Sequence, residues 1–432
     1  MSGKPLTLRV RQSLMGETPK TALAHYELEV MNSTLGRLSE VATLFFKLGI
    51  IGFGGPVAHI AMIEDEVVKR RQWMTREHFL DLLGATNLIP GPNSTEMAIH
   101  VGYVYAGWLG LIVAGVCFIL PAVLITGVFA WIYVNYGNLP QVAPLLYGIK
   151  PAVLAVILDA LWRLGKKAVK SRQMSAIALG VVVLLLLLKL NEVIALLIGG
   201  ILGMIWLRSG DRNNTPPNTA NFLIANLTTG AAFKTTAVSA ATTAHTVTNV
   251  SLWKLGLFFL KVGSVLFGGG FVLVAFLEGG LVQEYGWLTQ QQLLDAIAIG
   301  QFTPGPVLST ATFIGYIIAG VQGAIVATVG IFLPSFFFTA ILNPLVPRLR
   351  ASKWTSAFLD AVNVSAVALM FVVTLELAAT TLIPKAAYVD FLAVAIAIIS
   401  AVLLIRFRIN AAWLVFGGAF IGWVASFLGY TR

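Results

Sequence analysis

Charge is what this sequence has least of. Charged residues make up 11% of its 432 positions and hydrophobic residues make up 57%, and the mean hydropathy is +0.85. Soluble proteins carry roughly 25% charged residues, so this chain has more apolar surface than a soluble fold could bury. Apolar runs long enough to cross a bilayer recur along its length, and they must be helical to satisfy their own backbone groups. The composition therefore predicts an all-α polytopic membrane protein.

Cysteine and the short motifs of catalysis are also scarce. The one cysteine, Cys117, lies inside an apolar run, which excludes a disulfide framework and a thiol metal cluster. The chain has no His-Glu-x-x-His, no Gly-x-Ser-x-Gly, no phosphate-cradling Gly-x-x-x-x-Gly-Lys and no paired histidines at metal spacing. We therefore predict no enzyme, no cofactor and no metal site. The same absences exclude an ATP-driven pump.

The net charge of +10 would suit a nucleic-acid partner, but the Lys and Arg residues are confined to short loops between apolar stretches. That distribution is typical of orientation signals in a membrane protein. The predicted partner is the lipid bilayer, and no nucleic acid is expected.

One stretch of the chain occurs twice. Phe53-Gly54-Gly55 returns as Phe267-Gly268-Gly269, and Pro90-Gly91-Pro92 returns as Pro304-Gly305-Pro306, each 214 positions later (304 − 90). Beyond the Pro-Gly-Pro the matches continue at an offset of 213, as between Gly102 and Gly315. One unit has therefore been duplicated and fused. We predict a polar lead-in over 1–38, a first transporter repeat over 39–207, a linker over 208–250 and a second repeat over 251–432.

The basic loops indicate how each repeat crosses the membrane. If residues 79–106 crossed as one helix, the basic loops at 69–76 and 163–172 would face opposite sides. A re-entrant hairpin with the Pro-Gly-Pro at its tip places both loops in the cytoplasm, although it leaves the partly basic N-terminal tail outside. Each half then has about five crossings plus one hairpin, and the two homologous repeats are inverted. This plan is typical of secondary transporters.

These motifs resemble a known family. A Phe-Gly-Gly element after an intramembrane lysine, a Trp-x-Thr at 73–75, the Pro-Gly-Pro and the whole-chain duplication resemble the chromate transporter family in its long form with two fused domains. The resemblance spans roughly residues 40–430. It implies a multi-pass protein of the cell inner membrane that expels chromate from the cytoplasm, and some members have been linked to sulfate.

Chromate and sulfate are tetrahedral dianions, so a carrier needs positive potential within the membrane. The helices that begin after Pro92 and Pro306 point their positive N-terminal ends at the hairpin tips. Hydroxyl and amide donors lie in those first turns, and capping of the helix is the alternative role. The predicted substrate-binding residues here are Pro90, Gly91, Pro92, Asn93, Ser94, Thr95, Pro304, Gly305, Pro306, Ser309 and Thr310.

Lys47 and Lys261 lie at matching places inside apolar spans. An ammonium there costs roughly 2.5 to 3.5 kcal/mol on insertion scales, so its presence in both copies calls for a reason. We predict that both attract the oxyanion, and snorkelling to the interface is the alternative. Nearby Gly54, Gly55, Gly268 and Gly269 would let backbone N–H groups approach the anion.

Other polar residues are weighed by the same comparison of the two copies. Glu96 has no acidic counterpart near Ser309 and is the proton-coupling candidate, although an acid also suits a helix N-terminus. Asn87 and Gln301, each three residues before a Pro-Gly-Pro, are predicted to contact substrate oxygens. The remaining polar residues are expected to have structural roles. Asp81 and Asp295 would cap a helix or pair with loop cations, and Glu64 and Glu278 would lie solvated at the ends of spans. His59 and His100 would be packed, hydrogen-bonded side chains.

The sequence thus predicts a secondary transporter of tetrahedral oxyanions, with chromate efflux driven by a proton or membrane-potential gradient as the first choice. A sulfate or other oxyanion permease and an anion channel stay open as alternatives, and so does a homodimer. We expect the two Pro-Gly-Pro turns to meet near the middle of the membrane, each beside its own Gly-Gly break and lysine.

Overall fold

The computed structural model describes residues 19–53, 55–86, 88–137, 139, 142–188, 190–209, 250–267, 270–342, 352–383 and 390–429. Every regular element in these residues is a helix, which confirms the predicted all-α class. The first half contains α2 (Pro19–Ile51), α3 (Gly55–Glu64), η1 (Asp65–Arg70), α4 (Arg76–Thr86), α5 (Asn93–Tyr136), α6 (Ala143–Ala168), α7 (Arg172–Leu188) and α8 (Glu192–Ser209). The second contains α10 (Leu252–Val265), η2 (Gly270–Val272), α11 (Leu273–Leu277), η3 (Glu278–Glu284), α12 (Gln290–Phe302), η4 (Val307–Ser309), α13 (Thr310–Leu342), α15 (Lys353–Leu382), α16 (Phe391–Phe407) and α17 (Ala411–Phe427).

Helix breaks fall where proline and glycine place them. α4 and α5 are separated at Pro90-Gly91-Pro92, and α12 and η4 are separated at Pro304-Gly305-Pro306. Proline lacks an N–H and disfavours helical geometry in the residue before it, so neither helix can continue through the motif. The predicted split of the first span is also present, because α2 ends at Ile51 and α3 begins at Gly55.

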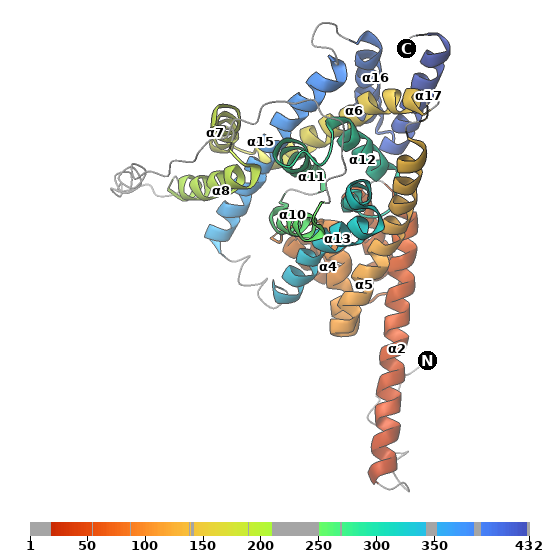
Figure 1. Cartoon of the computed structure of the whole chain (residues 1–432). Helices are drawn as coiled ribbons and strands as arrows, with labels where there is room; N and C mark the ends of the chain where they lie inside the picture. Colours follow the sequence, from red (N-terminus) through yellow and green to blue (C-terminus); the bar gives the residue numbers. More distant parts are fainter. Residues whose placement is uncertain are drawn as a thin grey trace.

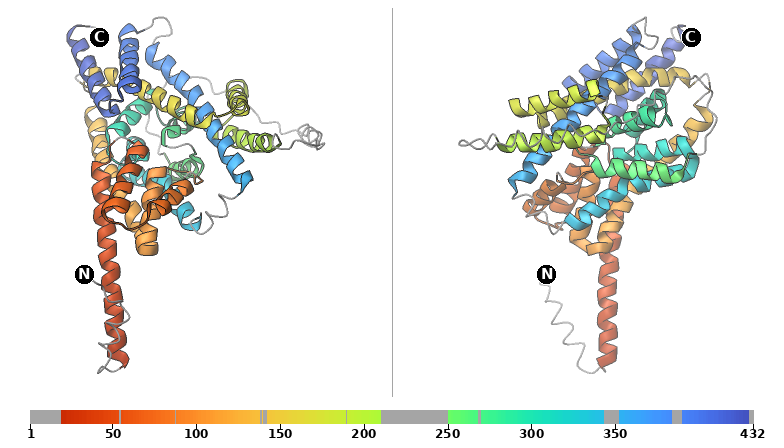
Figure 2. Two further views of the ribbon diagram at one scale, coloured as in Figure 1. Left: turned by 180° about the vertical axis from the view of Figure 1, so that it is seen from behind. Right: turned by 60° about the vertical axis from the view of Figure 1, so that its left-hand side comes forward.

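α2 includes part of the polar lead-in as well as the start of the first predicted repeat. It begins at Pro19 and runs unbroken through residue 38, where the sequence suggested the end of a lead-in. Figure 1 and Figure 2 show its N-terminal part extending well past the body of the molecule. The stretch holds no proline after Pro19 and one glycine before residue 40, so nothing local stops the helix.

α5 and α13 each contain a sharp reversal at a matching place. The backbone leaves helical geometry at Ala106 and Gly107 (φ +66°) and again at Ala319 and Gly320 (φ +61°). Positive φ is readily adopted only by glycine, which accounts for Gly107 and Gly320. On either side of the first reversal, the carbonyl oxygen of Gly110 occupies the place of a Cβ on Gly102. In a straight helix these residues would lie about 12 Å apart, at 1.5 Å per residue, so the chain folds back on itself here.

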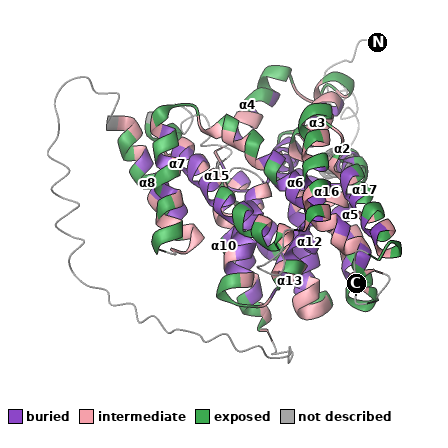
Figure 3. Cartoon of the chain, turned by 90° about the horizontal axis from the view of Figure 1, so that it is seen from above, coloured by how far each residue is buried: buried purple, intermediate pink, exposed green. Residues whose placement is uncertain are grey.

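The long helices expose an apolar stripe along one face. Its residues recur every fourth position and are between 41% and 63% exposed: Trp108, Ile112, Val116, Leu120, Leu124 and Val128 on α5, and Val321, Ile325, Val329, Leu333, Phe337 and Ile341 on α13. Figure 3 shows exposed residues on the outward faces of the helices and buried ones between them. Apolar stripes of this size need a lipid environment.

Four helical stretches among the described residues are long and apolar enough to cross a membrane: Asn93–Tyr136, Ala143–Ala168, Val307–Ile341 and Trp354–Leu382. Three shorter apolar helices accompany them: Arg172–Leu188, Phe391–Phe407 and Ala411–Phe427. With the exposed stripes, these helices make the chain a multi-pass α-helical membrane protein.

The two halves exchange helices. α6 of the first half packs against α16 and α17 of the second, and α15 of the second packs against α7 and α8 of the first (Figure 1). Small residues make these crossings close. The carbonyl oxygen of Gly418 occupies the place of a Cβ on Gly148, and Ser365 Oγ does the same at Gly199. The halves therefore form one packed body.

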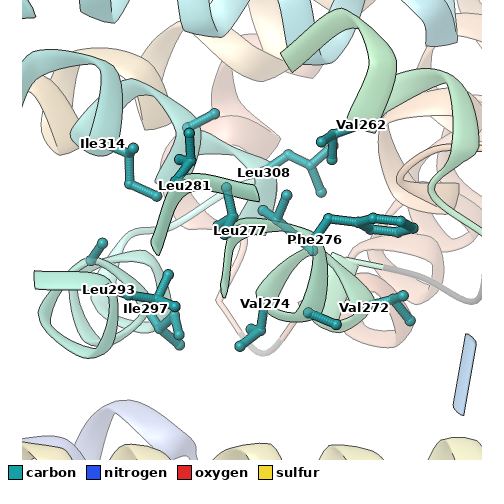
Figure 4. Packing of buried hydrophobic residues seen from close by; sticks show 14 of the residues in the cluster. Val262, Val272, Val274, Phe276, Leu277, Leu281, Leu293, Ile297, Leu308 and Ile314 are labelled. Carbon is teal, nitrogen blue, oxygen red and sulfur yellow. The ribbon is translucent and has the colours of Figure 1, made fainter. Parts of the chain in front are cut away.

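The largest apolar core surrounds the broken helix of the second half. Figure 4 shows its side chains meeting from α10, η2, α11, η3, α12, η4 and α13. Leu277, Leu281, Leu293 and Leu308 are fully buried in it. A helix as short as α11 is not stable alone, so this packing holds the break in place.

Candidate functional site

Each Pro-Gly-Pro turn is bonded to the helix break of the opposite half. The N–H of Gly91 donates to the carbonyl of Leu266 at 2.8 Å, and the N–H of Gly305 donates to the carbonyl of Gly52 at 2.7 Å. Gly52 and Leu266 hold the same place in the two repeats (266 − 52 = 214). The two bonds are therefore one interaction made twice, in opposite directions. They link the two halves at the point where the helices of both halves are broken, and we call this point the crossing.

Only glycine fits the middle of each turn. Gly91 has φ +144° and Gly305 has φ +91°, a region that side chains rarely adopt. A Cβ on Gly91 would meet a carboxylate oxygen of Glu96 and lie 2.6 Å from Ser335 Oγ. A Cβ on Gly305 would lie 2.9 Å from the Cβ of Ala122. Ala122 and Ser335 also correspond between the repeats (335 − 122 = 213). α13 therefore packs against the first turn at the same place where α5 packs against the second turn.

The helix that follows the first turn presents its N-terminus to this crossing. α5 begins directly after Pro92, and no side chain caps it. Ser94, Thr95 and Glu96 in its first turn are at most 1% exposed. In the second half η4 follows Pro306, again without a side-chain cap, and Ser309 and Thr310 are at most 2% exposed. The predicted donors are thus buried at the crossing, and Thr310 already bonds the carbonyl of Val307.

A hydroxyl cluster joins the halves beside the second turn. Thr126 Oγ1 of α5 lies 3.2 Å from Ser309 Oγ and 3.3 Å from Thr303 Oγ1. Thr126, Ser309 and Thr303 are all buried. Three hydroxyls in one buried spot can rearrange their hydrogen bonds, because each both donates and accepts.

Glu96 holds the corresponding place beside the first turn (309 − 96 = 213). It is 0% exposed, and neither carboxylate oxygen has a hydrogen-bond partner among the described residues. Among the described residues, Thr95 Oγ1 on the same turn of α5 and Ser335 Oγ and Thr339 Oγ1 on α13 are also buried without hydrogen-bond partners. A carboxyl group buried without a partner is costly as an anion, so this spot suits a group that gains and loses a proton.

Lys47 points its ammonium at a carboxylate outside the crossing. Its Nζ lies 3.3 Å from Glu66 Oε1, and the Lys47 side chain is 51% exposed. Arg70 and Arg71 also pair with Glu66. Burial raises the pKa of Glu66, but the hydrogen bonds from Lys47 and Arg71 and the nearby charge of Arg70 outweigh burial and bring the pKa below its ordinary value. Lys261 is exposed and is attracted electrostatically to Glu192.

Two acids differ from their predicted surroundings. Glu278 is fully buried rather than solvated, and its Oε1 accepts from Gln283 at 3.0 Å and from Gln290 at 3.1 Å. Asp295 is 1% exposed and accepts from Tyr133 of the first half at 2.8 Å, so it neither caps a helix nor pairs in a loop. Their first-half counterparts fit the expectation better, since Glu64 pairs with Arg76 and Asp81 is exposed.

The remaining predicted residues are placed as follows. Gln301 lies just before the second turn, and its Nε2 is buried without a partner among the described residues. Asn93 lines a cavity beside the first turn. His59 is packed as expected, with Nε2 2.9 Å from the carbonyl of Gly52, the same carbonyl that accepts from Gly305. Gly54, Asn87, Gly268 and Gly269 lie outside the described residues.

Sequence reasoning missed Gly52, Leu266, Thr126 and Ser335. A backbone carbonyl leaves no trace in a side-chain pattern, so the crossed bonds of Gly52 and Leu266 had no signal. Thr126 did have one, because Thr339 matches it at the offset of 213 (339 − 126). Among the described residues no group of three or more His, Cys, Asp or Glu could hold a metal ion.

Comparison with known proteins gives a consistent result. A family profile described as chromate transporter matches residues 39–204 and 253–423. A chromate transport protein of Cupriavidus metallidurans is 33% identical over 90% of this chain and 93% of its own length. A probable chromate transport protein of Synechococcus elongatus is 31% identical over 76% of this chain and 81% of its own, and a chromate transport protein of Pseudomonas aeruginosa is 30% identical over 88% and 90%. No solved structure matches.

Proposed function

Because the chain belongs to the chromate transporter family, we propose that it is a secondary transporter that carries chromate out of the cytoplasm across the cell inner membrane. Two of the similar proteins described above are named chromate transport proteins, and the third is named a probable chromate transport protein. The substrate of this chain is accordingly a tetrahedral dianion, and its cellular effect is chromate resistance.

The observation that carries this proposal is the pair of crossed bonds, Gly91 to Leu266 and Gly305 to Gly52. They bring the broken helices of both halves to one place. An uncapped helix N-terminus begins beside each turn and offers unpaired N–H groups to an anion. The dianion is held there by Asn93, Ser94, Thr95, Ser309 and Thr310, with the glycines allowing close backbone approach.

Transport occurs when the two halves move against each other and the contacts between the Pro-Gly-Pro turns and the opposite helix breaks change. The two repeats are inverted, and each Pro-Gly-Pro is the tip of a re-entrant hairpin that enters from its own side. When the halves rock against each other, one hairpin opens to the cytoplasm and then the other opens outward. The sharp reversals at Gly107 and Gly320 support this plan, since they allow 93–106 and 307–319 to return toward the surface from which the hairpin came.

The energy source has two parts. A membrane potential is worth about 2.3 kcal/mol per elementary charge per 100 mV, and twice that for a dianion, so a negative cytoplasm drives chromate outward. Glu96 adds proton coupling, because its unpartnered, fully buried carboxyl group sits against the turn that contacts the substrate. Protons enter with the gradient as chromate leaves.

Radiolabelled chromate uptake into inside-out vesicles tests the proposal. These vesicles expose the cytoplasmic face, so we expect saturable uptake that rises when the lumen is made acidic or electrically positive. Right-side-out vesicles under the opposite gradients, with a lumen that is alkaline and electrically negative as in the cell, should take up little. Saturable uptake of sulfate without chromate would assign a sulfate permease, and non-saturating flux that responds to the membrane potential but ignores the pH gradient would assign a channel.

A further inference from the structure

A cavity of about 380 Å³ opens beside the first Pro-Gly-Pro turn. Its walls come from both halves: Ile89 and Asn93 at the turn, Phe267 at the second break, the end of α6 with Lys167 and Lys170, and α15 with Asp360 and Asn363. This volume lies in the range of ligand sites. A water molecule takes about 30 Å³ in the liquid, so a hydrated tetrahedral oxyanion fits inside.

The charges of the cavity favour an anion. Lys167 and Lys170 both line it, and among the described residues neither ammonium forms an ion pair within the usual distance. Two other cations of the same stretch are engaged elsewhere: Arg163 pairs with Asp159 at 2.8 Å, and Lys166 lies over the ring of Trp162 at 4.6 Å. Among the described residues that line the cavity, Asp360 is the one carboxylate, so the net charge of this lining is positive.

The cavity leads toward the crossing. Asn93 lies in its wall and is also the first residue of α5, whose uncapped N-terminus adds positive potential. Asn363 and Ser356 add amide and hydroxyl donors from α15. A dianion attracted by the two lysines would therefore meet further donors on the way to Gly91.

From this geometry we propose that Lys167 and Lys170 form a loading site on the cytoplasmic side, where a tetrahedral dianion binds before it enters the crossing. The inference rests on the proposed chromate efflux. It gives these lysines a role beyond orienting the protein, for which any basic residue of the loop would serve equally.

Chromate uptake into inside-out vesicles, measured against concentration, tests the loading site. The double variant K167Q/K170Q should raise KM roughly tenfold with little change in the maximal rate, because attraction of the dianion is lost while the crossing is intact. K166Q is the matched control, since it removes a charge from the same loop without touching the cavity, and it should leave KM unchanged. D360N should lower KM, because it removes the one opposing charge.

Two outcomes would overturn the loading site. One is an equal effect of K166Q and of K167Q/K170Q, which is the result for orientation signals. The other is an unchanged KM in both K167Q/K170Q and D360N. Absence of chromate uptake by the wild-type protein would instead overturn the proposed function itself.

A second readout does not need transport. In a C117S background, Ser356→Cys, which lines the cavity and leaves both lysines in place, should react with a thiol reagent from the cytoplasmic face, and added sulfate should slow that reaction. If the K167Q/K170Q protein fails to insert, this protection decides the matter. A reaction rate that ignores sulfate would contradict the site.

Discussion

At the scale of single residues, Lys47 tests whether charge near the broken helix serves the substrate or the fold. Its ammonium pairs with Glu66, which also holds Arg70 and Arg71. We propose that this cluster matters for its net positive potential. Lys47→Met should then reduce chromate transport several-fold, whereas Glu66→Gln, which breaks the same pair but adds positive potential, should not reduce it. Lys261→Met is expected to act like Lys47→Met.

The measurement is initial transport rate per inserted protein, with membrane protein quantified for each variant. Equal losses in Lys47→Met and Glu66→Gln would mean that the pair is structural. Unchanged rates in Lys47→Met, Lys261→Met and the double variant would end the attraction role for both lysines.

The surroundings of Glu96 support a role in proton coupling. Its carboxyl group is wholly buried beside Gly91 and Ser335, and it has no hydrogen-bond partner in the part of the chain that the structure describes. Glu96→Gln keeps the size but cannot release a proton, so an imposed pH gradient should no longer drive transport, while a membrane potential still should. The measurement compares uptake under each gradient alone. Full response of the Gln variant to a pH gradient would place the coupling group elsewhere.

The residue scale also shows the limit of sequence reasoning. His59 was predicted to be packed and is, because an apolar helix offers few other roles. The burial of Glu278 and Asp295 was not predicted. Tyr133 reaches Asp295 only through tertiary packing, and Gln283 reaches Glu278 within η3, a π-helix that the sequence pattern does not indicate. A duplicated position indicates that a residue matters, but the two copies need not share their surroundings, as exposed Asp81 and buried Asp295 show.

At the scale of elements, the two turns depend on glycine. Alanine at Gly91 or Gly305 would combine an unfavourable φ with contacts to Glu96 and Ser335 in one case and to Ala122 in the other. Such backbone strain costs about 1 to 3 kcal/mol. Gly91→Ala and Gly305→Ala should each lower transport at least roughly tenfold, because the turn must shift and its crossed bond lengthens.

Gly127→Ala and Gly180→Ala are matched controls, since a Cβ at either glycine meets nothing within 4 Å and neither glycine has a positive φ. Their transport should equal the wild-type rate. Wild-type transport in both turn variants would show that the turns do not need to approach the other half closely.

Helix positions were predictable because their breaks are local. Pro-Gly-Pro ends α4 and α12 in any surroundings, and the repeat transfers each boundary from one half to the other. The exchange of α6 and α15 between halves was not predictable, because the glycines at 148, 199 and 418 show that helices pack closely without showing which partner they meet.

At the scale of the whole molecule, inversion of the repeats is open to a labelling test. In a C117S background, single cysteines at Ala168 and Ser352 should be shielded from an impermeant thiol reagent in intact cells, and a cysteine at Gln283 should react. The positions follow from the distribution of basic loops. The same sidedness for 168 and 283 would end the inverted arrangement.

The central claim is that the two halves build one site, with α5 of the first half against the segment that follows the second turn. Thr126 Oγ1 and Ser309 Oγ lie 3.2 Å apart, so sulfur atoms in their places are within reach of a disulfide. In a C117S background with a protease site inserted in the predicted linker, Thr126→Cys with Ser309→Cys should hold the cleaved halves together on a non-reducing gel. Oxidation should also stop chromate uptake and reduction should restore it, whereas single-cysteine proteins show neither effect. Halves that separate after oxidation would contradict the shared site.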